Sequence, residues 1–137
     1  MKSQLITYLT CTLLALGLSV NTAPPTFAGI ALNTIDPVAY RTESGRWVVV
    51  TGPIVCTAGE GVTLRVTVTQ RGSGAVGQGH TRFPCTGALQ QWEVRVARDK
   101  KAAFADGVAM AVAFARTTAQ GTPTDAHQWR VEVTVTD

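Results

Sequence analysis

The chain has 137 residues, 45% of them hydrophobic, which is enough for one globular domain with a core of its own. Its 12 lysines and arginines against 9 acidic residues give a formal net charge of +3. These basic residues are spread along the sequence and form no dense stripe, so the electrostatic signature of a nucleic-acid-binding protein is excluded.

Residues 1–28 have the pattern of a secretory signal peptide. Lys2 gives a short basic start, residues 5–20 are mostly apolar, and a closing Thr-Phe-Ala places small residues at positions −3 and −1 of a cleavage site. The alternatives are a transmembrane anchor, for which the apolar run is too short, and lipidation of Cys11, which lies too near the start. We therefore predict a secreted mature domain, residues 29–137, without stable membrane insertion after cleavage.

Removal of this leader leaves two cysteines, Cys56 and Cys85. In an exported protein two cysteines usually pair, and a loop of this length contributes roughly 3–4 kcal/mol to stability in the chain-entropy estimate. The alternative is a redox or metal site of the Cys-x-x-Cys type, which the wide separation disfavours. We predict a structural disulfide between them.

In chain order, the mature sequence predicts short strands separated by glycine- and proline-rich turns. The predicted strands are residues 35–40, 47–50 continuing over 54–56, 62–69, 89–97, 108–115 and 129–135. The segment 62–69 is the clearest, because apolar and polar residues alternate with a period of two. Pro37 places the first strand at an edge, and Thr-Gly-Pro at 51–53 predicts a bend in the second.

Other segments are less regular. Residues 29–33 are expected to be a loose arm, residues 70–80 a glycine-rich loop with at most a short edge strand, and residues 117–126 a turn region. Alanine content would allow residues 108–115 to be a helix. The alternation of bulky and small residues there favours a strand that is covered on both faces.

Six or seven short strands with almost no helical pattern indicate an all-β sandwich or barrel. About 100 residues, about seven strands and one disulfide favour an immunoglobulin-like antiparallel β-sandwich. Trp47, Trp92 and Trp129 occupy inward-phased strand positions and are expected in the core, although aromatic side chains also line sugar-binding faces. We further hypothesise that Trp92 packs on the disulfide.

Five short motifs resemble a group of small exported bacterial proteins of unassigned function. They are Val-Cys-Thr-Ala-Gly-Glu (55–60), Val-Thr-Val-Thr-Gln (66–70), Pro-Cys-Thr-Gly (84–87), Gln-Trp (91–92) and Phe-Ala-Asp-Gly (104–107). The resemblance covers most of the mature chain and implies an immunoglobulin-like sandwich with a single disulfide. It brings no catalytic residues with it.

No constellation of reactive residues predicts an enzyme. The Gly-x-Gly-x-x-Gly at residues 72–77 is followed by no helix, so it predicts a flexible hairpin loop and not a dinucleotide site. His80, Asp125 and His127 would have to converge from two loops to bind a metal ion. Ser44 and Ser73, the mature chain's serines, lie in no nucleophile elbow. We predict no catalytic residue, no metal and no cofactor.

The predicted function is therefore a non-catalytic binding or structural module, with a small secreted enzyme inhibitor as the alternative. The expected partner is a protein or a cell-wall polymer, and we expect a monomer. Contacts are expected on the two predicted loops, since loops on rigid sandwiches carry recognition. The candidate residues are Arg71, Gln78, His80, Arg82, Asp125 and His127. The outer face of residues 62–69, with its threonines and Arg65, is either a solvated surface or a second contact region.

Overall fold

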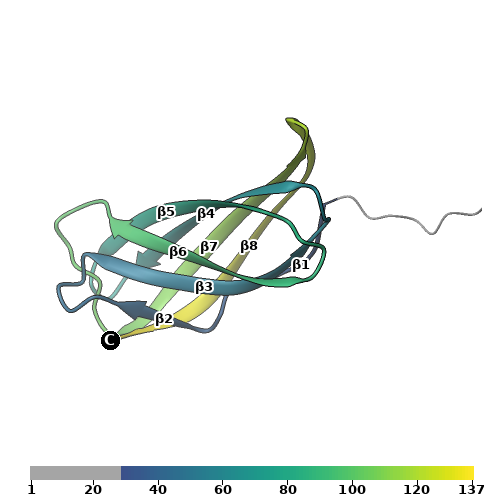
Figure 1. The fold of residues 1–137 in the computed structure, drawn as a ribbon. Coiled ribbons are helices and arrows are strands. Elements are labelled where there is room, and N and C mark those ends of the chain that lie inside the picture. Colours follow the sequence, from purple (N-terminus) through teal and green to yellow (C-terminus); the bar gives the residue numbers. More distant parts are fainter. Residues whose placement is uncertain (1–28) are drawn as a thin grey trace, which may run out of the picture.

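The computed structural model describes residues 29–137, of which about 70% lie in strands and none in a helix (Figure 1). The strands are β1 (Ile30–Asn33), β2 (Val38–Arg41), β3 (Trp47–Cys56), β4 (Gly61–Gln70), β5 (Ala75–Pro84), β6 (Leu89–Arg98), β7 (Gly107–Ala119) and β8 (Thr122–Thr136). Within residues 29–137 there is accordingly no helix long and apolar enough to cross a membrane. The predicted leader lies outside the described residues.

The eight strands form one sheet that closes on itself. Their order is β1-β3-β2-β8-β7-β4-β5-β6, and β6 also pairs with β3, antiparallel, from Trp47–Ala97 to Val55–Leu89. This pairing completes a seven-stranded barrel, with β1 as one extra strand on the edge of β3. The predicted immunoglobulin-like sandwich is therefore wrong, because that fold keeps two separate sheets. A strand's own pattern does not reveal its neighbour, and the pairing of β3 with β6 decides between the two architectures.

The interior of the barrel receives alternate side chains from each long strand. On β4 the predicted apolar set is buried, and Thr63 and Arg65 point outward. Gln70 continues the inward face and is also buried. Its side chain donates to the carbonyl of Ala105 at 2.7 Å and accepts the Ala105 N–H at 2.9 Å. The end of β4 thereby fixes the connection between β6 and β7.

The segment 108–115 is a strand, as predicted, but its faces are used differently from the expectation. Its four alanines point inward and are buried, and its bulky residues point outward. Small side chains suit this wall because larger side chains from the other strands, including Trp92, occupy the interior. The outward residues are Val108, Met110, Val112 and Phe114.

The glycine-rich segment predicted as a contact loop belongs mostly to β5, which pairs with β4 over its whole length. A side chain at Gly77 would collide with the carbonyl group of Ala97, and one at Gly79 with the carbonyl group of Arg95. Glycine at these two positions lets the backbone of β5 lie against that of β6, where the sheet bends to close. The prediction of a flexible loop is therefore wrong for this segment.

The other predicted contact loop, residues 117–126, is the end of the β7–β8 hairpin. Only Gln120 and Gly121 connect the two strands, and both have positive φ (50° and 81°), as a two-residue primed turn requires. The ladder is continuous except for an irregularity at Thr117/Thr118. Figure 1 shows this hairpin extending beyond the rest of the barrel.

The N-terminal segments also differ from the expectation. The predicted loose arm contains β1, which pairs with the last residues of β3, and the predicted strand at residues 35–40 begins only at Val38. Strand β3 runs through the predicted bend without a break. Gly52 makes this possible, because a side chain there would collide with the carbonyl of Thr34 and come within 2.6 Å of the Trp92 ring.

Candidate functional site

One outer surface of the barrel combines exposed apolar side chains with arginines. We call it the β7 face, and it consists of the outward side chains of β4, β5, β7 and β8 together with Arg71 in the turn after β4. At its centre is an apolar stripe in which Val108 is 57% and Phe114 is 43% exposed. Met110 and Val112 lie between them and are partly covered. Exposed large apolar groups that form a contiguous stripe indicate a contact surface more strongly than scattered ones do.

The strand register places arginines directly beside this stripe. Phe114 lies opposite Arg65 on β4, and Val112 lies opposite Arg130 on β8. Glu132, opposite Met110, is the acidic side chain of this face. The arginines of the face are Arg65, Arg71, Arg82, Arg116 and Arg130.

Charge is thus unevenly distributed over the described residues. The β7 face holds five arginines and one glutamate, whereas the other residues from 29 to 137 hold six lysines and arginines against eight acids. The overall charge of the chain is only slightly positive, but this one surface is strongly so. Such a field attracts an anionic partner and orients its approach.

Two hollows lie on this face. The larger, about 570 Å³, is lined by side chains on both sides of the apolar stripe, including Arg71, Val108 and Arg130. The smaller, about 150 Å³, is lined by Thr63, Arg65, Phe114 and Arg116. Each hollow therefore combines an apolar side chain with at least two guanidinium groups.

The structure separates the predicted contact residues into two groups. Gln78, His80 and Arg82 point outward from β5, where they lie opposite Thr67, Arg65 and Thr63 of β4. Arg71 lies in the turn after β4 and lines the larger hollow. These four belong to the β7 face, although on a strand and a turn and not on the predicted long loop.

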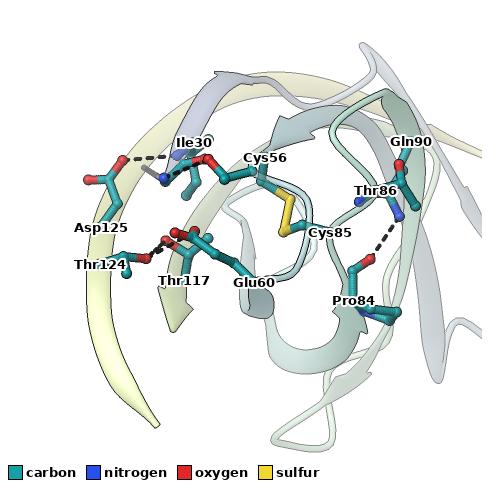
Figure 2. Close-up of a disulfide and its surroundings, with 12 residues drawn as sticks. Ile30, Cys56, Glu60, Pro84, Cys85, Thr86, Gln90, Thr117, Thr124 and Asp125 are labelled. Carbon is teal, nitrogen blue, oxygen red and sulfur yellow. Dashed lines mark hydrogen bonds between the residues drawn. A yellow bond between two sulfur atoms is a disulfide. The ribbon is translucent and has the colours of Figure 1, made fainter. Parts of the chain in front are cut away.

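Asp125 and His127 lie elsewhere, near the start of β1. One carboxylate oxygen of Asp125 accepts the Ile30 N–H at 3.0 Å (Figure 2). The same oxygen lies 3.2 Å from Nε2 of His127. The hydrogen bond from Ile30 is the main cause that lowers the pKa of Asp125 from 3.8. The carboxylate is a structural tie between β8 and β1 and does not face the apolar stripe.

A buried carboxylate lies close to this tie. Glu60, which is 6% exposed, accepts a hydrogen bond from the Thr124 hydroxyl at 3.0 Å, and the Thr117 hydroxyl lies 2.8 Å from that of Thr124 (Figure 2). Because Thr124 donates to Glu60, Thr117 donates to Thr124. This chain joins the β3–β4 connection to the end of the β7–β8 hairpin.

The predicted disulfide between Cys56 and Cys85 is confirmed, with a Cα–Cα distance of 5.4 Å. Backbone hydrogen bonds support it, from the Cys85 N–H to the Glu60 carbonyl at 2.8 Å and from the Gly87 N–H to the Cys56 carbonyl at 3.0 Å. Figure 2 shows the bridge next to Glu60, at the same end of the barrel as β1. A disulfide is compatible with an oxidising compartment.

The three tryptophans are not equivalent. Trp92 is buried and Trp129 is partly buried, as expected for core residues, and the indole N–H of each has no partner within the described part of the chain. Trp47, by contrast, is 37% exposed and has the Arg95 guanidinium 5.1 Å above its ring, so the prediction of a core position is wrong for this residue. The packing of Trp92 on the disulfide stays a prediction.

The described residues contain no cluster of three or more His, Cys, Asp or Glu side chains suited to a metal ion. Ser73, the serine nearest to His80 in sequence, donates its hydroxyl to Gln70 at 2.6 Å and accepts the Ala75 N–H at 3.2 Å. Its hydroxyl therefore has a structural role at the turn between β4 and β5. That the protein is not an enzyme therefore stays a prediction from the sequence.

Comparison of the sequence with models of protein families finds no match, and comparison with curated proteins finds none either. The resemblance to exported bacterial proteins therefore stays an expectation. The apolar stripe of the β7 face is the feature that sequence reasoning missed. The alternation of bulky residues and alanines in residues 108–115 is visible in the sequence. Whether the bulky residues or the alanines face outward depends on how the other strands fill the barrel interior.

Proposed function

We propose that the protein is a secreted, non-catalytic binding module, and that its β7 face binds a protein partner that presents acidic and apolar side chains together. The observation that carries this proposal is the exposed stripe from Val108 to Phe114, which lies between Arg65 of β4 and Arg130 of β8. The leader-like N-terminus and the disulfide support secretion.

The chemistry of the face favours a protein over a cell-wall polymer. Guanidinium groups bind carboxylates and phosphates alike, so arginines alone do not distinguish the two. Phe114 and Val108 do, because burying such a side chain contributes about 1.5–3 kcal/mol only when the partner supplies apolar surface. An anionic polyol phosphate has little such surface, whereas an acidic protein segment with aromatic residues has both.

A defined probe tests this preference. Oxidised protein comprising residues 29–137 is titrated with a glutamate–tyrosine copolymer, with polyglutamate and with a polyol phosphate of matched charge. We expect the copolymer to bind at least tenfold more tightly than the other two, with an affinity that falls as salt rises. Equal binding of all three polymers, or no binding of the copolymer, would contradict the proposal.

Variants localise the binding. Phe114→Ser should weaken copolymer binding at least tenfold, because it removes the exposed ring without touching the interior. The matched control is Leu89→Ser, since Leu89 is 66% exposed but lies on β6, outside the β7 face. For charge, Arg65→Glu is compared with Arg46→Glu, which changes an exposed residue before β3.

Identification of the natural partner follows from the same variants. A protein of the source culture counts as the partner only if wild type and Leu89→Ser retain it and Phe114→Ser and Arg65→Glu lose it. If that protein is an extracellular enzyme that binding inactivates, the protein is an inhibitor, which was the alternative function. A protein that wild type and these three variants retain equally argues against the β7 face.

A further inference from the structure

The residue that would become the N-terminus after leader removal lies in a constrained position. Gly29 has a φ of +108°, and its N–H donates to the Thr57 hydroxyl at 3.0 Å. Its carbonyl accepts the Thr57 N–H, also at 3.0 Å. Both backbone groups of Gly29 are therefore held at the end of β3, next to the disulfide.

The carboxylate of Asp125 lies directly against Gly29. A side chain built on Gly29 would come within 2.5 Å of the Asp125 Oδ2 atom, so only glycine fits here. Because the nitrogen and a Cβ on one Cα are about 2.5 Å apart, the Gly29 nitrogen lies within about 5 Å of that oxygen. At this distance an α-ammonium group is attracted to the carboxylate, and a contact ion pair, with nitrogen and oxygen about 4 Å apart or less, forms once the nitrogen moves toward it.

The carboxylate is suited to a cation. It accepts N–H groups of Ile30 at 3.0 Å and Ala126 at 2.8 Å, and these bonds favour its ionised form. The cationic group beside it is His127, at 3.2 Å, which carries a charge only when protonated. At neutral pH the site thus holds an ionised carboxylate beside the backbone nitrogen of Gly29.

We propose that cleavage after Ala28 creates a structural ion pair between the new α-ammonium group of Gly29 and Asp125. In the cleavage, water adds to the Ala28 carbonyl and the bond to the Gly29 nitrogen breaks. Ala28 leaves as a carboxylate, and the freed amine takes a proton to become an ammonium group. The inference rests on the proposed export and is independent of the ligand of the β7 face.

The ion pair would strengthen the weak contact between β1 and β8. Strand β2 pairs with β8 at residues 134–136, but β1 has no ladder with β8 among residues 29–137. The hydrogen bond from Ile30 to Asp125 is the direct tie between β1 and β8 there. An ammonium group at Gly29 adds a second interaction with the carboxylate of Asp125. Removal of the leader therefore strengthens the attachment of β1 to β8.

The test compares three N-termini on residues 29–137: free Gly29, N-acetylated Gly29, and a chain extended by Ala28. A protease that leaves glycine as the first residue supplies the free form. We expect the free form to melt about 4 °C above the other two, as expected for a partly buried ion pair in a domain of this size. Equal melting temperatures of the three forms would overturn the proposal.

The variant Asp125→Asn provides the second arm. In this background the three forms should melt together, and a free-amine advantage that persists would overturn the assignment of Asp125. If Asp125→Asn does not fold, the amine itself decides: in wild type its pKa should exceed that of an unstructured glycine peptide by at least half a unit. Sequencing the N-terminus of exported protein must give Gly29, and a different first residue would contradict the cleavage step.

Discussion

A single methyl group tests whether the barrel is closed between β5 and β6. Gly77 is buried where β5 crosses β6, and the Cβ of an alanine there would overlap the carbonyl group of Ala97 and lie 3.1 Å from a methyl group of Val96. The first obstacle is backbone, so no side-chain rotation relieves it. The variant Gly77→Ala must therefore separate two paired strands or distort them.

The size of the effect follows from two opposing contributions. Overpacking of this kind typically costs about 1–3 kcal/mol. Replacing glycine by alanine also restricts the unfolded chain, which stabilises the fold by about 0.4–1 kcal/mol. We expect a net loss of about 1–2 kcal/mol in the free energy of unfolding.

Gly61→Ala is the matched control. Gly61 also lies in a strand and its φ is not positive, but the nearest atom to a new Cβ is the Thr118 hydroxyl oxygen at 3.9 Å. Only the effect on the unfolded chain remains, so this variant should gain up to about 1 kcal/mol. Urea unfolding of the oxidised proteins, followed by tryptophan fluorescence, measures both. If Gly77→Ala proves as stable as Gly61→Ala, β5 does not lie against β6 and the closed barrel is wrong.

Two further predictions concern the end of the barrel that carries the disulfide. Replacing Cys56 and Cys85 together by alanine should lower the free energy of unfolding in guanidinium by about 3–4 kcal/mol, and a loss below about 1 kcal/mol would show that the bridge hardly constrains the unfolded chain. The hydrogen bond from Ile30 lowers the folded-state pKa of Asp125 from 3.8, so the stability that this carboxylate contributes is present above about pH 4 and is lost as the pH falls through the folded-state pKa. The difference in unfolding free energy between wild type and Asp125→Asn should shrink from pH 6 to pH 2, and a difference that does not change with pH would refute this assignment.

Local patterns predicted the parts of the fold that depend on one strand at a time. Residues 62–69 predict β4, because apolar and polar residues that alternate with a period of two indicate a strand with one buried face. The two cysteines likewise predicted their own pairing. The alternation can be recognised within one short segment, and the disulfide follows from the number of cysteines.

The features that sequence reasoning missed depend on neighbours. In the sequence alone the glycines of β5 indicate a flexible loop, whereas in the structure Gly77 and Gly79 are needed because the backbone of β6 passes beside them. The phase of β7 depends on how much of the interior other strands fill, so the inward set could not be chosen from residues 108–115 alone. Closure into a barrel depends on the β3–β6 pairing, for which neither strand carries a local mark.

The candidate site was predicted only in part for the same reason. Gln78, His80 and Arg82 were singled out, and they do lie on the proposed binding surface. The sequence pattern predicts a strand covered on both faces for Phe114 and Val108, whereas both are exposed in the structure. Asp125 was selected as a contact residue, but its hydrogen bond with Ile30 links residues far apart in sequence and gives it a structural role.

The most direct test of the proposed binding face is a proton–nitrogen NMR titration of the oxidised mature protein with the glutamate–tyrosine copolymer. We predict that the largest shift changes fall on residues 63–69 of β4 and 108–116 of β7, with smaller changes on the outward residues of β5 and β8. Changes concentrated at residues 119–123, at the tip of the β7–β8 hairpin, or on β3 and β6 would contradict binding by the β7 face.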